Sequence, residues 1–455
     1  MSTVAPTSTN ARLSSDFWKF FIGQTLSNLG SSFTNFALPL IVYKLTGSAL
    51  NLAITSAAVF LPYLLFGLVI GAWVDRLDRK RVMIIVDSIN TIIIVSIPIL
   101  AYVGLLSIGY IYVVGFVAST AGIFFQSSEF AAIPNLVKQN DLVTANGRIQ
   151  ASYSIMQFAG PIIAGALVFL IPVETLLFID ATSFLVSVIS LLLVRVSFNP
   201  PPSEEPKAPT SLGQDIMEGL RYVLGHPVLR MISLMMALVN FFGSTIGFEM
   251  VYFSKKQLAV QDWQYGFIVA AGPIGVAVLS LLAGPLHKRF KFSRVALTAL
   301  ALDGLFTIAL GLTVNIWVAI VLIALSTGLG ILFNINTGSL RQAIVPNHML
   351  GRVMTIAGVL AWSAIPVGTI IGGIAIDRTQ GTTLSLGALG TIQNIGIIFA
   401  IIGGVTFIMP LLFALTSLGH AEKYLPKDVP PESIPLETVE EIRREEPAIP
   451  QVLPL

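Results

Sequence analysis

The chain has 455 residues, of which 55% are hydrophobic and only 11% are charged, and its formal net charge at pH 7 is +2. This composition excludes an assembly of soluble domains, and the spread of the basic residues over alternate loops excludes a nucleic-acid-binding face. Because the sequence contains no cysteine, disulfides and thiolate metal sites are excluded as well. We therefore predict an all-α polytopic membrane protein.

The N-terminal half begins with a polar segment, residues 1–16, which lacks the hydrophobic region of a signal peptide and which we expect in the cytoplasm. A bundle of six transmembrane helices is predicted over residues 17–196. The apolar runs that are long enough to span a membrane in this half lie at about 17–44, 48–74, 82–104, 108–136, 149–171 and 174–195.

Residues 197–227 separate the two halves and are predicted to form a cytoplasmic linker. The early part of this segment reads FNPPPSEEPKAPT, which is too rich in proline to be helical. The later part reads SLGQDIMEGLRYVLGHP and has apolar residues at helical spacing, among them Ile216, Leu220 and Val223. We predict an amphipathic helix there, lying on the cytoplasmic surface.

A second six-helix bundle is predicted over residues 228–418, which brings the total to twelve transmembrane helices. Residues 419–455 are rich in proline and glutamate and are expected to form a disordered cytoplasmic tail. The apolar runs of the second half lie at about 228–253, 263–286, 294–314, 316–343, 353–375 and 392–418.

The lysine and arginine residues predict the orientation of the chain. If both termini are cytoplasmic, 22 of the 26 basic residues fall on the cytoplasmic side, and only Lys44, Lys255, Lys256 and Arg378 fall on the outer side. Cytoplasmic loops of membrane proteins carry such an excess of basic residues. We therefore expect a multi-pass protein of the cell (inner) membrane with both termini in the cytoplasm.

The two halves look like sequence repeats. A Pro-Asn pair followed by a Gly-Arg pair and then by a proline inside a helix occurs once in each half. These elements are Pro134-Asn135, Gly147-Arg148 and Pro161 in the first half, and Pro346-Asn347, Gly351-Arg352 and Pro366 in the second. Parallel repeats around a central path suit a carrier that exposes one midplane site to each side of the membrane in turn.

The loop between the second and third spans carries the most specific motif. The run from Thr46 to Ile84, which contains GAWVDRLDRKR, resembles the major facilitator superfamily, and within it the branch of macrolide-efflux proteins and the enterobactin exporter. The family's loop motif is matched by Gly71, Asp75, Arg76, Arg79 and Lys80. The resemblance implies twelve helices in two six-helix bundles and a transport function without a cofactor.

A conformational latch is the function we expect for this loop. Gly71 permits close approach of two helices, and Asp75 can lie near the amino end of the helix that begins around Arg352, where a helix dipole favours an anion by about 0.3 to 1 kcal/mol. The resemblance implies that Arg76, Arg79 and Lys80 complete the ionic cluster. The alternative is that these cations act only as the topogenic signal.

The fifth span contains FAGPIIAG, which resembles the glycine-proline motif of exporters in this superfamily through Gly160, Pro161 and Gly165. The match is partial, because Met156 and Ala164 stand where the fuller motif has glycine. The resemblance implies a role in the direction of transport, and the alternative is ordinary close packing of helices.

Carboxylates inside the spans are the candidates for proton coupling, because an ionisable group there costs about 2.5 to 3.5 kcal/mol. Asp303 lies nearest the middle of the ninth span, Glu249 lies toward the outer end of the seventh, and Asp180 lies near the outer end of the sixth. The alternative for each is that it satisfies a neighbouring helix. The fourth span lacks the arginine that many drug/proton antiporters carry there.

By analogy with the fold, the first, fourth, seventh and tenth spans should line a central cavity. Amides beside aromatic rings can hold a large amphipathic molecule without requiring one particular charge. The candidate cavity residues are Gln24, Asn28, Asn35, Gln126, Asn240, Phe241, Phe242, Asn334 and Asn336. All four histidines fall in loops, at helix ends or in the tail, so we expect no metal site.

These features predict a monomeric secondary transporter that exports a small amphipathic compound, such as a macrolide-like drug or a siderophore, in exchange for protons. The expected partners are the lipid bilayer, the small-molecule substrate and protons, with no nucleic acid. No Gly-Lys pair occurs, which excludes a phosphate-binding P-loop, and no nucleophile motif indicates an enzyme. The alternatives are an importer, a facilitator or a lysophospholipid flippase on the same fold, or a membrane sensor that does not transport.

Overall fold

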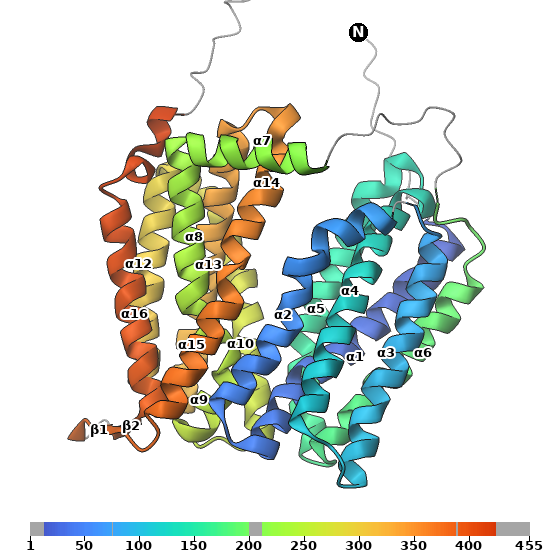
Figure 1. The fold of residues 1–455 in the computed structure, drawn as a ribbon, viewed down its shortest axis with the longest axis horizontal. Helices are drawn as coiled ribbons and strands as arrows, with labels where there is room; N and C mark the ends of the chain where they lie inside the picture. Colours follow the sequence, from blue (N-terminus) through green and yellow to red (C-terminus); the bar gives the residue numbers. More distant parts are fainter. Residues whose placement is uncertain (1–12, 75, 200–211, 388–389, 425–455) are drawn as a thin grey trace, which may run out of the picture.

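A computed structural model describes residues 13–74, 76–199, 212–387 and 390–424. Within these ranges the chain is almost entirely helical, and its long helices form two bundles that stand side by side (Figure 1). The first bundle consists of α1 (Ser15–Thr46), α2 (Ala49–Val74), α3 (Arg79–Tyr102), α4 (Ile108–Leu136), α5 (Leu142–Val168) and α6 (Leu176–Leu193), with short 3₁₀ turns at Gln139–Asp141 and Val173–Thr175.

The second bundle also has six membrane-length elements, three of which are broken into two helices. Its helices are α8 (Pro227–Phe248), α9 (Met250–Lys256), α10 (Asp262–Ser280), α11 (Ala283–Arg289), α12 (Phe292–Gly311), α13 (Ile316–Ile344), α14 (Asn347–Trp362), α15 (Ala364–Arg378) and α16 (Asn394–Phe413). The break before α15 has a clear cause, because Pro366 has no N–H to donate to the carbonyl of Trp362. A small antiparallel hairpin, β1 (Thr383–Ser385) and β2 (Thr391–Gln393), joins α15 to α16.

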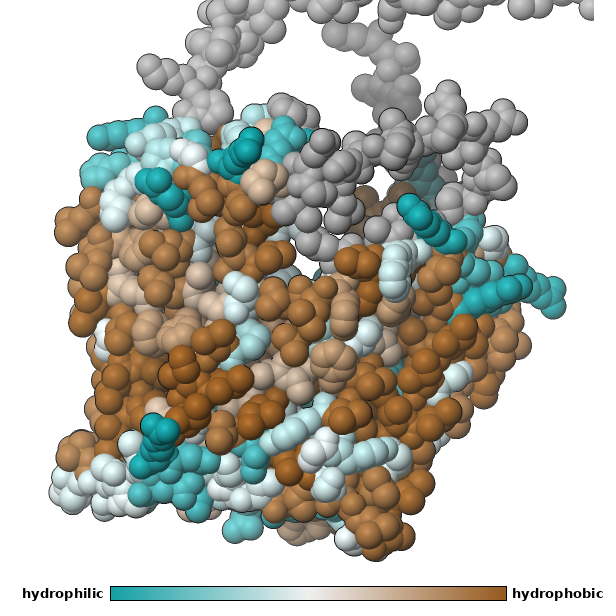
Figure 2. Space-filling model, viewed as in Figure 1, coloured by the Kyte–Doolittle hydropathy of each residue, from teal (hydrophilic) through white to brown (hydrophobic). Residues whose placement is uncertain are grey.

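The prediction of a twelve-helix membrane fold is confirmed. In the described part of the chain, eleven helical elements are long and apolar enough to cross a membrane. The twelfth is α1, which runs the full height of the first bundle (Figure 1) and is less apolar because it carries Gln24, Asn28 and Asn35. On the face drawn in Figure 2, a broad apolar belt lies between two polar ends, as expected for a protein surrounded by lipid.

The two ends of the molecule are named here by their position relative to the chain ends. The terminal face carries the start of α1, the end of the 3₁₀ segment Ser417–Tyr424, and α7 (Leu212–Gly225), which lies across the second bundle (Figure 1). The distal face carries the α1–α2 turn, where Gly47 adopts a positive φ of 61° and so allows the chain to reverse within two residues.

The helix α7 lies in the segment where the sequence predicts an amphipathic helix. Its apolar side faces α14, where Val223 belongs to the same buried cluster as Val353 and Ile356. An added Cβ at Gly219 would lie 3.3 Å from the carbonyl oxygen of Arg352, so the two helices are in close contact. The linker helix is therefore part of the second half.

Candidate functional site

The two halves meet at the distal face, where α2 packs against α15 and α5 packs against α10. Both crossings use small residues. An added Cβ at Gly373 would lie 2.6 Å from the Cβ of Ala53, and one at Gly165 would lie 2.7 Å from the carbonyl oxygen of Trp263. Such residues allow helix backbones to approach closely. Toward the terminal face the bundles diverge (Figure 1).

Asp377 joins the halves at one of these crossings. It lies at the end of α15, and its carboxylate accepts hydrogen bonds from Ser48 Oγ at 2.6 Å, the Ala49 N–H at 3.0 Å and the Leu50 N–H at 3.3 Å. These groups form the amino end of α2, whose first N–H groups have no partner within the helix and whose dipole favours a negative charge. Asp377 therefore caps a helix of the other half.

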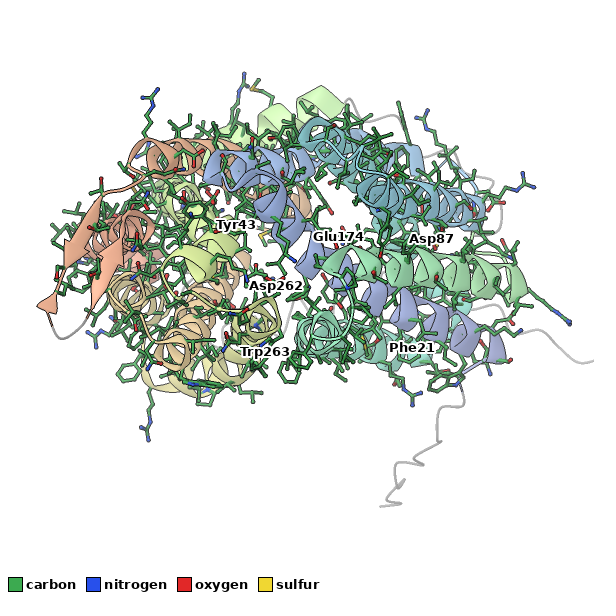
Figure 3. All side chains as sticks on the ribbon, turned by 90° about the horizontal axis from the view of Figure 1, so that it is seen from below. Phe21, Tyr43, Asp87, Glu174, Asp262 and Trp263 are labelled. Atoms are coloured by element: carbon green, nitrogen blue, oxygen red, sulfur yellow. The ribbon has the colours of Figure 1, made fainter. Side chains whose placement is uncertain are left out.

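An ion cluster lies at the same face. Lys44 of α1 contacts Asp262 of α10 at 2.6 Å, and Lys255 of α9 contacts the other oxygen of Asp262 at 2.5 Å. Figure 3, which looks onto the distal face, shows Asp262 and Trp263 at the boundary between the halves, with Tyr43 nearby. We refer to the Asp377 cap, this ion cluster and the two small-residue crossings as the distal gate.

A cavity of about 420 Å³ lies between the halves beside the distal gate. Residues of α1, α2, α8, α9, α10 and α13 line it, so it is built from both bundles. None of the described residues that line it is charged. Its wall consists of Asn35, Leu38, Pro39, Leu52, Thr55, Ser56, Val59, Gly247, Phe248, Met250, Tyr265, Ile268, Val269, Gly272, Ile323 and Thr327. The cavity can hold an uncharged molecule that is mostly apolar.

Of the nine residues predicted for the cavity, the structure places Asn35 in its wall. Two others connect helices within a bundle, because Gln24 Nε2 donates to Ser187 Oγ at 3.0 Å and Asn240 Nδ2 donates to the Ala361 carbonyl at 2.9 Å. Asn336 is buried, and its Nδ2 donates to the Leu332 carbonyl of its own helix.

The remaining predicted cavity residues lie away from this wall. Gln126 and Asn334 are exposed, Asn28 is half-buried, and the half-buried rings of Phe241 and Phe242 pack edge to face. Which polar side chains reach the cavity depends on how each helix is rotated about its axis.

The three predicted coupling carboxylates differ in their hydrogen bonds. Asp180 accepts hydrogen bonds from Thr34 Oγ1 and Ser183 Oγ inside the first bundle, and Asp303 accepts one from Ser326 Oγ between α12 and α13. Glu249 is fully buried at the junction of α8 and α9, and neither of its oxygens has a hydrogen-bond partner among the described residues. Glu249 lies between Phe248 and Met250, which line the cavity beside the distal gate.

Asp75, the central acid of the predicted latch, lies outside the described residues, and Gly71 lies within α2. Arg76 is exposed. Arg79 Nη1 donates to the carbonyls of Ala131 and Phe198 at 2.9 and 3.2 Å, and Lys80 Nζ donates to the Val194 carbonyl at 2.7 Å. These two cations therefore tie together the terminal-face ends of the first bundle.

The expected partner region of the latch lies in the second half. The helix expected to begin around Arg352 begins at Asn347, and Arg352 itself contacts Glu218 of α7 at 2.6 Å. In this structure the described contacts of Arg79, Lys80 and Arg352 thus lie within their own halves.

The glycine-proline motif of the fifth span lies at two helix contacts. An added Cβ at Gly160 would collide with Ser32 of α1 within the first bundle. One turn further on, Gly165 faces α10 of the second half, and the carbonyl oxygen of Pro161 would lie 2.5 Å from a Cβ added at Gly266. The motif is therefore part of the distal gate.

Asp377 did not emerge from the sequence as a candidate, although a signal for it exists. Gly373, three residues, Asp377 and Arg378 repeat the spacing of Gly71, Asp75 and Arg76. Gly71 lies in the last turn of α2 at the terminal face, and Asp377 lies in the last turn of α15 at the distal face (Figure 1).

The family model of transmembrane secretion effectors matches residues 2–416. The chain belongs to this family of major facilitator transporters. It is 26% identical over 360 residues to the multidrug efflux pump Tap of Mycolicibacterium fortuitum, covering 76% of this chain and 86% of that pump. It is also 26% identical over 377 residues to macrolide efflux protein A of Streptococcus pyogenes, covering 80% and 89% of the two chains.

Solved structures share the fold of this secretion effector. A bacterial homologue of the lysosomal transporter Spinster, in an inward-facing and unoccupied conformation, matches with a TM-score of 0.70 at 15% identity over 91% of this chain and 98% of that one. An inward-facing bacterial homologue of the iron transporter ferroportin matches with a TM-score of 0.66 at 16% identity over 88% and 98%. Together with the family match and the related efflux pumps, this identifies the protein as a membrane transporter and not an enzyme.

Proposed function

We propose that this secretion effector exports an uncharged, amphipathic small molecule across a bacterial inner membrane by alternating access. The observation that carries the proposal is a cavity that both halves line, beside the distal gate. The hydrogen bonds and the ion pair described above that join the two halves all lie at this distal face. The names of the related efflux pumps support export rather than uptake.

The excess of basic residues in the loops on the same side of the membrane as the two termini supports an orientation with both termini in the cytoplasm. With that orientation the distal gate faces outward, and this structure corresponds to an inward-open state. The substrate enters from the cytoplasm or the inner leaflet and leaves when the distal gate opens.

The cavity wall supports the substrate class. Tyr265, Asn35, Thr55 and Thr327 offer hydroxyl and amide groups within an otherwise apolar surface, and the lining has no charge that would select an ion. A volume of about 420 Å³ lies within the range of drug-binding pockets. Neutral, amphipathic drugs and dyes fit this chemistry.

Proton exchange supplies the energy in this proposal. The electrical part of the gradient alone is worth about 2.3 kcal/mol per charge per 100 mV. Asp180, Glu249 and Asp303 remain the candidate proton carriers, and the transporter works as a monomer whose partners are the bilayer, the substrate and protons.

Efflux from cells tests this function. Cells that produce the protein are loaded with macrolides, dyes or siderophores, and retention is measured with and without a protonophore. We expect lower retention of at least one compound, abolished by the protonophore and by Ser56→Trp, which fills the cavity. Ile92→Trp on the exposed side of α3 is the matched control and should export normally. Efflux that survives Ser56→Trp, substrate accumulation instead of loss, or no transport of any compound would refute the proposal.

A further inference from the structure

Glu249 has an unusual environment for a carboxyl group. Its side chain is fully buried, and both oxygens lack a hydrogen-bond partner among the described residues. An ionised carboxylate without a partner costs several kcal/mol in such a place, whereas the protonated form is far easier to bury. The geometry therefore favours a proton on Glu249 while the distal gate is closed.

The packing of α8 against α15 brings Glu249 to the gate. An added Cβ at Gly368 would collide with the Phe241 carbonyl, and one at Gly372 would collide with the side chain of Thr245. The contacts advance by four residues along both helices. One further turn brings Glu249 to the end of α15, where Asp377 caps α2.

Among the described residues, the titratable groups near Glu249 include Tyr252 and Asp377. Tyr252 of α9 lies one turn further on, and its ring packs edge to face on Tyr43 of α1 at 5.9 Å. Asp377 is the acid that acts on Glu249 electrostatically. The ion cluster of Lys44, Lys255 and Asp262 lies at the same face and is already internally paired.

We propose that Glu249 is the proton-binding group of the transport cycle, and that protonated Glu249 keeps the distal gate closed because it places no second negative charge beside Asp377. The inference rests on the proposed proton-coupled export and deepens it. When Glu249 loses its proton, two carboxylates repel each other in a poorly solvated place, and opening the gate admits water that relieves the repulsion.

The cavity supplies a route for that proton. Phe248 and Met250, the immediate neighbours of Glu249, line the cavity. In the inward-open state the proton leaves through the cavity as substrate enters, and in the outward-open state Glu249 takes up a proton from outside as substrate leaves. This order gives export of substrate against import of protons. Asp180 and Asp303, in contrast, each accept a hydrogen bond from a hydroxyl donor of their own half.

Cysteine labelling can test the gate directly, because the natural chain contains no cysteine. Ser56→Cys places one thiol in the cavity wall. A membrane-impermeant maleimide is added to the outer side of right-side-out vesicles, between about pH 5.5 and 8.5, and labelling is compared with that of the same protein after denaturation. For a gate held by one proton, outer labelling corrected for thiolate content should rise up to about tenfold per pH unit.

Variants of the Ser56→Cys protein separate the possible outcomes. Glu249→Gln should remove the pH dependence and leave labelling low, and Glu249→Asp should retain a pH dependence. Asp377→Asn should also remove the pH dependence and leave labelling low, because the repulsion is gone while asparagine can still cap α2. An unchanged pH slope in Glu249→Gln, or a slope lost only in Asp303→Asn, would overturn the inference.

Substrate efflux in the same cells distinguishes this failure from failure of the proposed function. If labelling depends on pH through Glu249 but no compound is exported, the gate mechanism stands and the proposed export function is wrong. Protonophore-sensitive efflux without that pH dependence would retain the exporter and reject Glu249. If Glu249→Gln does not fold, Asp377→Asn still tests the inference. The pH dependence of labelling should be lost in this variant, because ionised Glu249 then has no second carboxylate to repel.

Discussion

Gly165 of α5 and Gly266 of α10 face each other across the boundary between the two halves, and a Cβ added at either would lie 3.2 Å from the Cα of the other. A Cβ at Gly266 would also lie 2.5 Å from the carbonyl of Pro161. Closure of the distal face therefore requires that both positions carry no side chain.

We predict that Gly266→Leu weakens the closed distal gate. Overpacking of a close contact costs about 1 to 3 kcal/mol, which shifts the balance toward the open gate by roughly five- to hundredfold. Outer labelling of Ser56→Cys should rise accordingly and export should fall. Gly404→Leu in α16 is the matched control, because a Cβ there would meet nothing within 4 Å. Equal labelling of the two variants would contradict the prediction.

The positions of the spans could be predicted closely, because each is a long apolar run between polar segments. The fourth span was expected at 108–136 and is found at Ile108–Leu136. The breaks at Glu249 and Ser363 could not be predicted in this way, because hydropathy does not respond to a local change of backbone direction.

The candidate site was harder to predict, for a physical reason. Depth in the membrane can be read from the chain, and it indicated Asp180, Glu249 and Asp303 as costly groups. Whether such a carboxylate has a hydrogen-bond donor depends on the helix that faces it. The donor to Asp180 is Thr34, which is 146 positions away in the sequence. Asp377 lies at a helix end, where depth gives no signal; the repeated spacing of Gly373, Asp377 and Arg378 marks the position, and the contact with α2 shows its role.

Arg79 joins three segments of the first half at the terminal face. Its guanidinium donates to carbonyls at the end of α4 and in the chain after α6, while its backbone N–H donates to Asn199 Oδ1 at 3.0 Å. We predict that Arg79→Ala destabilises the protein by about 1 to 3 kcal/mol, because the Ala131 and Phe198 carbonyls lose a charged donor. Heating of detergent-solubilised protein followed by gel filtration would measure the loss.

Arg81→Ala is the control for Arg79→Ala, because this substitution removes the same charge from the same loop and the Arg81 side chain is 82% exposed. If the two variants melt together, the loop cations act through topology alone. Arg79→Lys keeps the charge with fewer donors and should fall between Arg79→Ala and the wild type.

His226 makes the stability of the second half depend on pH. Its Nδ1 accepts the Leu229 N–H at 3.4 Å and so caps α8, and burial lowers the pKa of His226 below 6.5. A group whose pKa is lowered in the folded protein stabilises fully above its unfolded pKa, and this contribution is lost as the pH falls through the folded pKa. We predict that the melting temperature of the wild type falls below about pH 6.

His226→Asn tests this pH dependence, because asparagine can cap a helix at any of these pH values. The drop in melting temperature at low pH should become smaller in this variant. An unchanged drop would mean that another group controls it.

Glu422, close to the end of the described chain at Tyr424, makes a specific contact with the second bundle. Its carboxylate accepts the Ser293 N–H at 3.0 Å and Ser293 Oγ at 2.7 Å, and so caps the start of α12. We predict that a chain ending at Tyr424 keeps full export, whereas Glu422→Gln lowers the free energy of unfolding by about 0.5 to 2 kcal/mol through a weaker cap. Both are measured by efflux and by thermal melting.

The same pair of variants also separates transport from signalling. Removal of residues 425–455 leaves both the distal gate and the Glu422 cap in place, so a transporter should not need them. Loss of efflux on this deletion, with unchanged melting and normal amounts of protein in the membrane, would show instead that the tail takes part in function. The carboxylate at position 422 matters for stability in either case, because Ser293 lies in the first turn of α12, the helix that carries Asp303.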